Sequence, residues 1–306
     1  MSLDIIAVAS QVRQMGQDIA TAQSDFRDCV RWARLLLQQH SERYKEVAAA
    51  VRESKESRTA RASLPMDEPL AFRRQAPPLA DSYVAAAADG SQAEPDRHGH
   101  VNYFLINTGT ALIAYGNEPA ASFRTVPRLY YKNEDLHVVE ERQADWKPDQ
   151  QPREALIDGE ILAMKRSVAE IEDLLRLAEN IPPALPSLLV VDGTLTLFAK
   201  TTGADAWVGD LLVSQYQAAL EAIHDKKLPI AGFISRSNAS WVMDMLQVGV
   251  CGRESEDCAF CRSRPQDGKA ACAMVGLRDR FLYDSTIDEP GVPAPLKPGE
   301  RGAVFQ

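Results

Sequence analysis

Two apolar segments of this chain each end in aspartate followed by glycine, and this repeated pattern constrains the fold most. Residues 84–91 read Val-Ala-Ala-Ala-Ala-Asp-Gly-Ser, and residues 188–194 read Leu-Leu-Val-Val-Asp-Gly-Thr. A short, wholly apolar run bounded by glycine is typical of a buried strand. Open α/β sheets bind ligands where their strands end, because the strand holds the side chain rigidly there. The pattern therefore predicts a functional edge that carries Asp89 and Asp192.

Predicted strands alternate with predicted helices after residue 80, which indicates an α/β fold. Residues 101–116 are interpreted as two strands that turn at Thr108-Gly109, and residues 123–131 as a further strand. Apolar residues at helical spacing predict a helix over 159–180. The remaining predicted elements are a buried strand that begins at 187 and ends in Asp192, a helix at 210–227, a strand at 228–236 and a short helix at 240–249.

The N-terminal segment has a different rhythm. Apolar residues alternate steps of three and four over more than four heptads, which is typical of a long amphipathic helix. The helix either packs on its own domain or pairs with a partner helix, and the spacing leaves both open. The residues of this stripe are Ile5, Val8, Val12, Met15, Ile19, Ala22, Phe26, Cys29, Ala33 and Leu36.

These patterns divide the chain into three parts. Residues 1–61 form the helical or coiled-coil segment, and they become polar after His40, as in a solvated helical tail. Residues 62–80 contain four prolines and are predicted to be a linker, because proline interrupts both helices and central strands. Residues 81–306 are predicted to form the second domain.

The net charge of −9 excludes a protein that holds nucleic acid by bulk positive charge. Residues 1–80 carry 12 Lys and Arg against 10 Asp and Glu, a net +2, so residues 81–306 carry −11. The surplus of carboxylates lies where the two aspartates lie. No apolar run has the length of a membrane span, and no secretory signal begins the chain, so we expect a cytoplasmic protein without membrane contact.

Carboxylates from neighbouring strands would form a hard-oxygen site suited to Mg²⁺ or Mn²⁺. Such cations activate water and stabilise the leaving oxygen in phosphodiester cleavage. Asp89 and Asp192 are the candidates, although an Asp-Gly pair is also a common turn. The helix between them offers a third carboxylate at Glu170, near the margin of the buried face, whereas Glu172 and Glu179 are predicted to be more exposed.

The four clustered cysteines have the spacing C-x6-C-x2-C-x10-C. Thiolates at this spacing either bind a structural Zn²⁺ tetrahedrally or remain as free thiols or a disulfide, since the spacing is not that of a standard zinc ribbon. They form a cysteine-rich insertion over about 251–272, composed of Cys251, Cys258, Cys261 and Cys272.

Five motifs together resemble the NurA nuclease family, in particular its bacterial branch. They are Asp89-Gly-Ser-Gln after a strand, Arg166-x-x-x-Glu170 on a helix, Leu188-Leu-Val-Val-Asp192-Gly-Thr-Leu, Gly232-Phe-Ile-Ser-Arg236-Ser, and Pro298-Gly-Glu-Arg-Gly-Ala-Val-Phe305. The resemblance covers roughly residues 80–306. It implies an RNase H-like mixed sheet flanked by helices, and a homodimer.

The resemblance also implies a function. Family members are Mn²⁺-dependent 5′-to-3′ exonucleases and single-strand endonucleases, and they resect DNA ends with the hexameric HerA ATPase during double-strand break repair. By motif match, Asp89, Asp192 and Glu170 are expected to be metal ligands. Asp279 resembles a recurrent family aspartate and is a fourth candidate, with a surface ion-pair patch as the alternative interpretation. Arg236 is expected either to contact a DNA phosphate or to be a plain surface arginine.

The chain departs from the family at its C-terminal end. Family members continue beyond the Gly-Glu-Arg motif to a helix whose histidine belongs to the active site, whereas this sequence ends at Gln306. We therefore expect a domain that is incomplete at its C-terminus. Two other hypotheses follow, namely an inactive adaptor of a HerA-type ATPase and a zinc-stabilised nucleic-acid-binding module.

Overall fold

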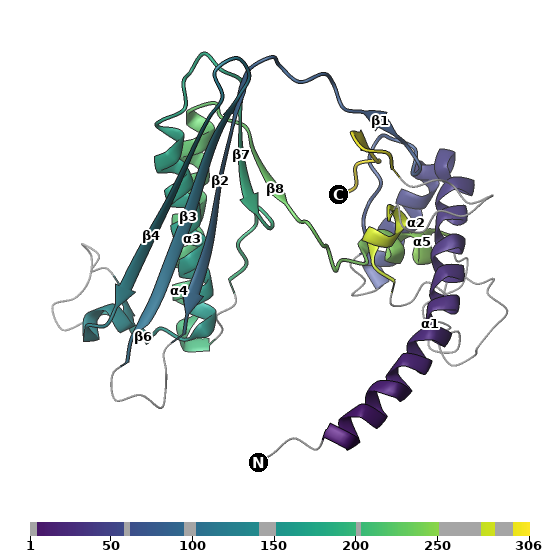
Figure 1. Cartoon of the computed structure of the whole chain (residues 1–306), viewed down its shortest axis with the longest axis horizontal. Helices are drawn as coiled ribbons and strands as arrows, with labels where there is room; N and C mark the ends of the chain where they lie inside the picture. The colour runs from purple at the N-terminus through teal and green to yellow at the C-terminus, as the bar shows by residue number, and fades with distance from the viewer. Residues whose placement is uncertain are drawn as a thin grey trace. The chain divides into compact units, whose positions relative to one another are not determined.

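The computed structural model, drawn in Figure 1, places most of the chain in two compact units. One unit is Leu79–Ser235, and the other combines Met1–Pro78 with Arg236–Gln306. The structure describes residues 5–57, 62–94, 102–140, 151–199, 203–250, 277–284 and 296–306.

A five-stranded sheet forms the centre of the Leu79–Ser235 unit. Its strands lie in the order β4-β3-β2-β7-β8. The first three strands pair antiparallel, whereas β7 runs parallel to β2 and β8 parallel to β7. The predicted mixed α/β sheet is thus confirmed. The strands are β2 (Tyr83–Ala93), β3 (Phe104–Tyr115), β4 (Ala120–Tyr130), β7 (Ser187–Asp192) and β8 (Ile230–Phe233).

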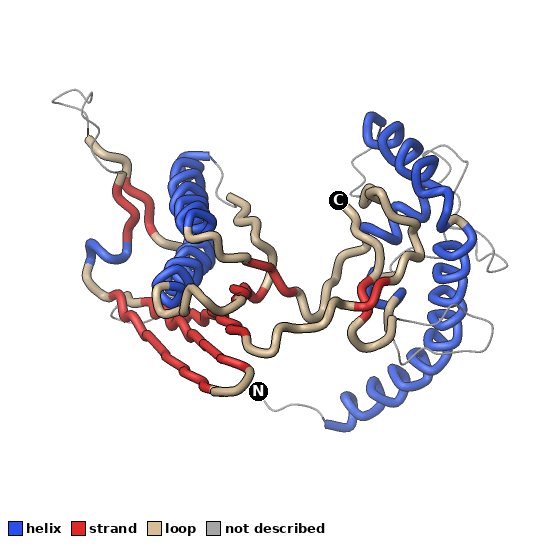
Figure 2. The backbone as a smooth tube through the Cα atoms, turned by 90° about the horizontal axis from the view of Figure 1, so that it is seen from above, coloured by secondary structure: helices blue, strands red, loops and turns tan. Residues whose placement is uncertain are grey.

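Two helices, α3 (Gly159–Ala178) and α4 (Ala206–Asp225), lie on the same side of this sheet (Figure 2). The side chain of Asp158 caps α3 by accepting a 2.9 Å hydrogen bond from the backbone N–H of Ile161. The apolar residues of α3 pack on every second residue of β2 and β3, because side chains alternate between the faces of a strand. The largest buried side chains of this core include Phe104, Ile106, Ile161, Leu162, Ile171, Leu174 and Leu189.

The prediction that residues 101–116 turn at Thr108-Gly109 is wrong. These residues form the single strand β3, in which Gly109 pairs with Asp89 on one side and with Thr125 on the other. Glycine is common in turns, but a strand accepts it where neighbouring strands supply the backbone partners. The consequence is that Gly109 leaves space beside Asp89 instead of reversing the chain.

Short elements extend the core beyond the sheet. The described part of residues 132–158 contains η2 (Asn133–Leu136) and the paired strands β5 (His137–Val139) and β6 (Glu154–Leu156). Leu136, Val138 and Ala155 are buried there. A further 3-10 turn, η3 (Gly203–Asp205), leads into α4.

The other unit packs N-terminal helices against segments from the end of the chain. It contains α1 (Ile5–Gln39), η1 (Ser41–Arg43), α2 (Tyr44–Ser57), α5 (Trp241–Val250) and η5 (Asp279–Leu282). Arg34 of α1 is 3% exposed and donates hydrogen bonds to the carbonyl oxygens of Phe281, Leu282 and Asp284. These bonds join segments that lie far apart in the sequence.

The predicted solvated tail and linker are both wrong. Val47 and Val51 of α2 are buried in a cluster with Met243 and Leu246 of α5. Within the predicted linker, Leu70 is buried, and the two-residue strand β1 (Arg74–Gln75) pairs with β9 (Glu300–Arg301). The proline content correctly excludes long elements, but it does not prevent the segment from packing.

The packing also divides the chain differently from the predicted 81–306 domain. The boundary near residue 80 agrees with the units, but residues 236–306 pack with the N-terminal helices. The reason is the apolar face of α5, which completes the cluster of α1 and α2. Pairing of α1 with a partner helix stays a prediction. Within the described part of the chain, no helix combines the length and apolarity that crossing a bilayer requires.

Candidate metal centre

Asp89 and Asp192 lie side by side on the sheet. The last parallel pair that joins β2 to β7 is Ala88 with Val191, and the next residue of each strand is the aspartate. Ala88 and Val191 face the buried side, so both aspartates point to the opposite face, where they are exposed. The sheet register therefore brings together the two carboxylates that the sequence singled out. β7 ends at Asp192 as predicted, but the predicted strand end at Asp89 is wrong, because β2 continues to Ala93 by pairing with β3.

Glu170 approaches the backbone of β2 next to Asp89 from the other face of the sheet, which α3 covers. It is 8% exposed, and its Oε1 lies 3.1 Å from Nε of Arg166, one turn earlier on the helix. A Cβ atom added to Gly90 would lie 2.5 Å from this Oε1. Glycine at position 90 therefore lets the carboxylate reach the backbone of β2 next to Asp89, whose own Oδ1 accepts a 2.7 Å hydrogen bond from the Gly90 N–H.

Electrostatics shows that the three carboxylates interact. The pKa of Glu170 is raised to about 7, above all by burial and also by the negative charges of Asp89 and Asp192, against the opposing effects of Arg166 and the Gly90 backbone. Burial, and to a smaller extent the negative charge of Glu170, raises the pKa of Tyr216 on α4. A buried carboxyl group with a raised pKa beside other carboxylates is typical of a functional site.

The donor set suits a hard divalent cation, because it consists of carboxylate oxygens. Two buried side-chain oxygens near this place, Oε1 of Gln92 on β2 and Oδ1 of Asn107 on β3, accept no hydrogen bond in the structure. As the side chains stand, no three His, Cys, Asp or Glu residues in the described part form a ready metal-binding group. Cation binding would therefore require the side chains of Asp89, Asp192 and Glu170 to move closer together.

A groove of about 600 Å³ opens over the two aspartates. Small residues, including Ala87, Gly109 and Ala111, form part of its lining. Two aromatic residues that the sequence analysis did not select, Phe123 and Phe233, also line it. Their importance follows only from the register that places them beside the carboxylates, so no local sequence signal could have identified them.

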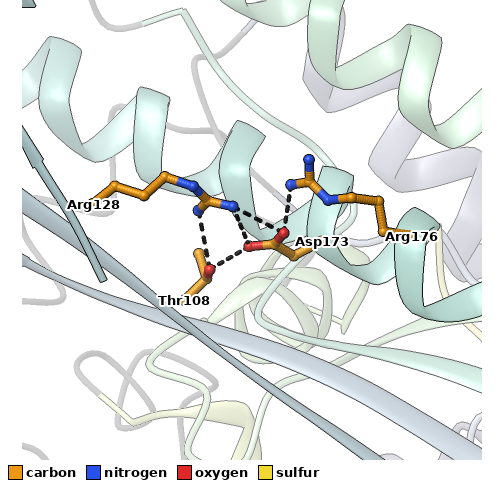
Figure 3. A network of polar contacts seen from close by, with 4 residues as sticks. All are labelled: Thr108, Arg128, Asp173 and Arg176. Carbon is orange, nitrogen blue, oxygen red and sulfur yellow. Dashed lines mark hydrogen bonds and ion pairs between the residues drawn. The ribbon is translucent and has the colours of Figure 1, made fainter. Parts of the chain in front are cut away.

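A buried polar network fixes α3 on the sheet, as Figure 3 shows. Asp173 is 6% exposed, and Nη2 of Arg128 donates to both of its carboxylate oxygens at 3.0 Å. Thr108 and Arg176 donate short hydrogen bonds to the same carboxylate. Burial alone would raise the pKa of Asp173, but these hydrogen bonds outweigh burial and lower it. Because Asp173 follows Glu170 by one turn, the network also orients Glu170.

The remaining predicted site residues have different surroundings. Asp279 lies in the other unit, where its Oδ1 accepts the backbone N–H groups of Val242 and Met243 at the start of α5. Burial raises its pKa, against these hydrogen bonds. This contact gives Asp279 a helix-capping role, and we do not include it in the candidate centre.

Arg236 is exposed and directly follows Ser235, which lines the groove. Its contact with DNA stays a prediction. Glu172 and Glu179 are exposed, as predicted. Cys251, Cys258, Cys261 and Cys272 lie outside the described residues, so the zinc hypothesis also stays a prediction.

Replacing Gly90 by alanine is expected to displace Glu170, because the new methyl group would overlap its Oε1. Overpacking of this kind typically costs about 1–3 kcal/mol, which thermal unfolding would detect. Gly109→Ala is the matched control, since the nearest atom to its added Cβ is the carbonyl oxygen of Asp89 at 3.8 Å. Equal unfolding temperatures for Gly90→Ala and the wild type would contradict the close approach of Glu170.

The stability of the metal-free protein is expected to fall as pH rises through the range in which Glu170 ionises. Its pKa is about 7 in the folded protein against 4.5 as the ordinary value. Folding therefore favours the protonated form, whose benefit is complete below pH 4.5 and is lost as pH rises through 7. The loss is at most about 3 kcal/mol.

Urea unfolding in EDTA at several pH values tests this dependence. Glu170→Gln should remove most of the decline between pH 5 and pH 8, whereas Glu172→Gln, an exposed residue of the same helix, should retain it. Identical pH profiles for the wild type and Glu170→Gln would show that folding does not raise the pKa of the Glu170 carboxyl group.

Comparison with known proteins identifies the family of the chain. The NurA domain matches residues 83–273, which is more than half of the chain. A crystal structure of LC9-RNase H1, a type 1 RNase H with the type 2 active-site motif, is similar at 11% identity, with a TM-score of 0.27. The match covers 72% of this chain and 97% of that one, and it is too weak to establish a common fold by itself. No protein of curated function matches the chain. With Asp89, Glu170 and Asp192 all inside the matched range, the chain belongs to the NurA family.

Proposed function

We propose that this protein is a metal-dependent DNA nuclease whose centre is formed by Asp89, Asp192 and Glu170. One observation carries the proposal. Three carboxylates from β2, β7 and α3 lie near enough for two of them to raise the pKa of the third. Membership of a nuclease family supports the same conclusion.

The residues of the centre would have distinct roles. Asp89 and Asp192 are exposed at the groove and would hold Mn²⁺ or Mg²⁺. Glu170 would provide the third carboxylate ligand from the face of the sheet that α3 covers. Once bound, such a cation activates water and stabilises the leaving oxygen of a phosphodiester. Arg166 and the Gly90 backbone keep the Glu170 carboxylate in place, and the groove leaves room for the substrate.

Finer properties of the function are proposed from the family alone. They are 5′-to-3′ exonuclease and single-strand endonuclease activity, action on DNA ends in double-strand break repair, partnership with a HerA-type ATPase, and a homodimer. Arg236 is proposed to contact a DNA phosphate.

A cleavage assay tests the proposal. The full chain is incubated with single-stranded DNA labelled at the 5′ end or at the 3′ end, and with blunt duplex, in Mn²⁺, Mg²⁺ or EDTA. We expect cleavage with Mn²⁺ and none with EDTA, and the two label positions report the polarity of digestion. Equal cleavage in EDTA would contradict the metal centre. Absence of cleavage with intact DNA binding would instead indicate the adaptor.

A further inference from the structure

Two phenylalanines of the groove are unusually exposed. The exposed fraction is 73% for Phe123 on β4 and 60% for Phe233 on β8. Both line the groove that contains Asp89 and Asp192. An aromatic ring open to water on a sheet face gains nothing from the core of its own unit, and such rings are typical of platforms that stack against a ligand.

The register of the sheet places the rings on both sides of the carboxylates. Phe233 pairs with Asp192, so it is the next residue on the same face. On the other side, Phe123 pairs with Ala111, which in turn pairs with Ala87, two residues before Asp89. With about 4.8 Å between strands, the backbones of Phe123 and Phe233 lie about 20 Å apart across the sheet.

The surface between the two phenylalanine rings carries small side chains and is acidic. Ala87, Gly109 and Ala111 carry little or no side chain, so nothing tall separates the rings from the aspartates. The carboxylates repel phosphates unless a cation intervenes, whereas bases carry no charge and stack on any aromatic face. A ligand that fits has flat apolar groups for the rings and one phosphate near the carboxylates.

We propose that Phe123 and Phe233 stack bases of a single-stranded DNA segment that crosses the carboxylate centre. This inference rests on the proposed function and adds how the substrate is held. In a duplex, the bases already stack on one another and cannot lie on a protein ring unless they are flipped out. A span of about 20 Å corresponds to at most about six nucleotides at 3.4 Å each.

A fluorescence titration tests the stacking without cleavage. The full chain is titrated in Ca²⁺ in place of Mn²⁺, so that a hard cation offsets the carboxylate charge, into single-stranded DNA that contains 2-aminopurine, whose emission is quenched when it stacks. A gel of the same samples verifies that the DNA stays intact. Wild-type protein should quench the probe. Phe123→Leu and Phe233→Leu keep an apolar side chain without the ring, and each should weaken binding about tenfold and reduce the quenching. Phe198→Leu is the control, since Phe198 is 68% exposed and lies outside the groove lining.

The outcomes separate this inference from the proposed function. Equal binding by Phe123→Leu, Phe233→Leu and Phe198→Leu would overturn the stacking role, whether or not the protein cleaves DNA. Tighter binding of the matching duplex or single-stranded RNA would overturn the choice of ligand. A changed oligomeric state in the two groove variants with unchanged DNA binding would identify the face as an interface between copies. Quenching without cleavage in Mn²⁺ would support stacking while the proposed function fails.

Discussion

Asp89→Asn is expected to slow Mn²⁺-dependent cleavage of single-stranded DNA by at least about 10³-fold. Asparagine keeps the size of the side chain but removes the charge that a divalent cation requires. Cations of this kind contribute several kcal/mol to the stabilisation of a transition state, and each 1.36 kcal/mol corresponds to a factor of about ten in rate. Initial rates on end-labelled DNA, with enzyme in excess, would measure the effect.

Asp81→Asn provides the matched control for this variant. Asp81 is an exposed aspartate just before β2, at the end of the strand away from the carboxylate centre. The Asp81→Asn variant should cleave DNA at the wild-type rate. Circular dichroism should show that the wild type, Asp89→Asn and Asp81→Asn are all folded. If Asp89→Asn retained the rate of Asp81→Asn, Asp89 would not be a ligand of the catalytic metal.

Asp173→Ala is expected to destabilise the Leu79–Ser235 unit by about 3–5 kcal/mol, because it leaves Arg128 and Thr108 without their buried partner. Hydrogen exchange of peptides from α3 and β3 reports this unit directly. A loss of 3 kcal/mol corresponds to exchange about 100-fold faster where protection depends on unfolding of the unit. Cleavage should fall as well, since the network orients α3 and thereby Glu170.

The exposed partner of the same carboxylate provides the comparison. The Arg176 side chain is 56% exposed, so Arg176→Ala should change stability by less than about 1 kcal/mol. If both variants exchanged at the same rate as the wild type, the network would not contribute to the stability of α3 on the sheet.

Local patterns were sufficient for the elements that carry the carboxylates. The apolar runs before Asp89 and Asp192 form β2 and β7, and the helical spacing after residue 159 forms α3. The strand signal is a continuous apolar run that stops at Asp-Gly, and the helix signal is apolar residues at helical spacing, so each signal is contained in a short window. The same windows indicated which helix glutamates are exposed.

Pairings between segments far apart in the sequence could not be predicted from local patterns. Gly109 looks like a turn residue until β2 and β4 are placed on either side of it. The α2 segment looks solvated until α5 covers Val47 and Val51. Both errors have one physical origin, because tertiary contacts override local preference where a partner supplies hydrogen bonds or apolar surface.

The candidate site shows the same division. Asp89, Asp192 and Glu170 follow from the Asp-Gly pairs after apolar runs, from helix position and from family motifs, whereas Phe123 and Phe233 required the sheet register. The sequence did not show that β2 continues past Asp89. Part of the net charge of −11 after residue 80 lies in the cluster of Asp89, Asp192 and Glu170. In this cluster, burial and the neighbouring negative charges raise the pKa of Glu170 to about 7.

Manganese binding tests the central claim most directly. Electron paramagnetic resonance of Mn²⁺ at pH 8 would measure the affinity of the wild type and of Asp89→Asn, Asp192→Asn, Glu170→Gln and Glu172→Gln. If Asp89, Asp192 and Glu170 form one centre, each of the first three variants should bind Mn²⁺ at least about tenfold more weakly than the wild type. Glu172→Gln should bind it normally. Wild-type affinity in all four variants would contradict a metal centre at this edge of the sheet.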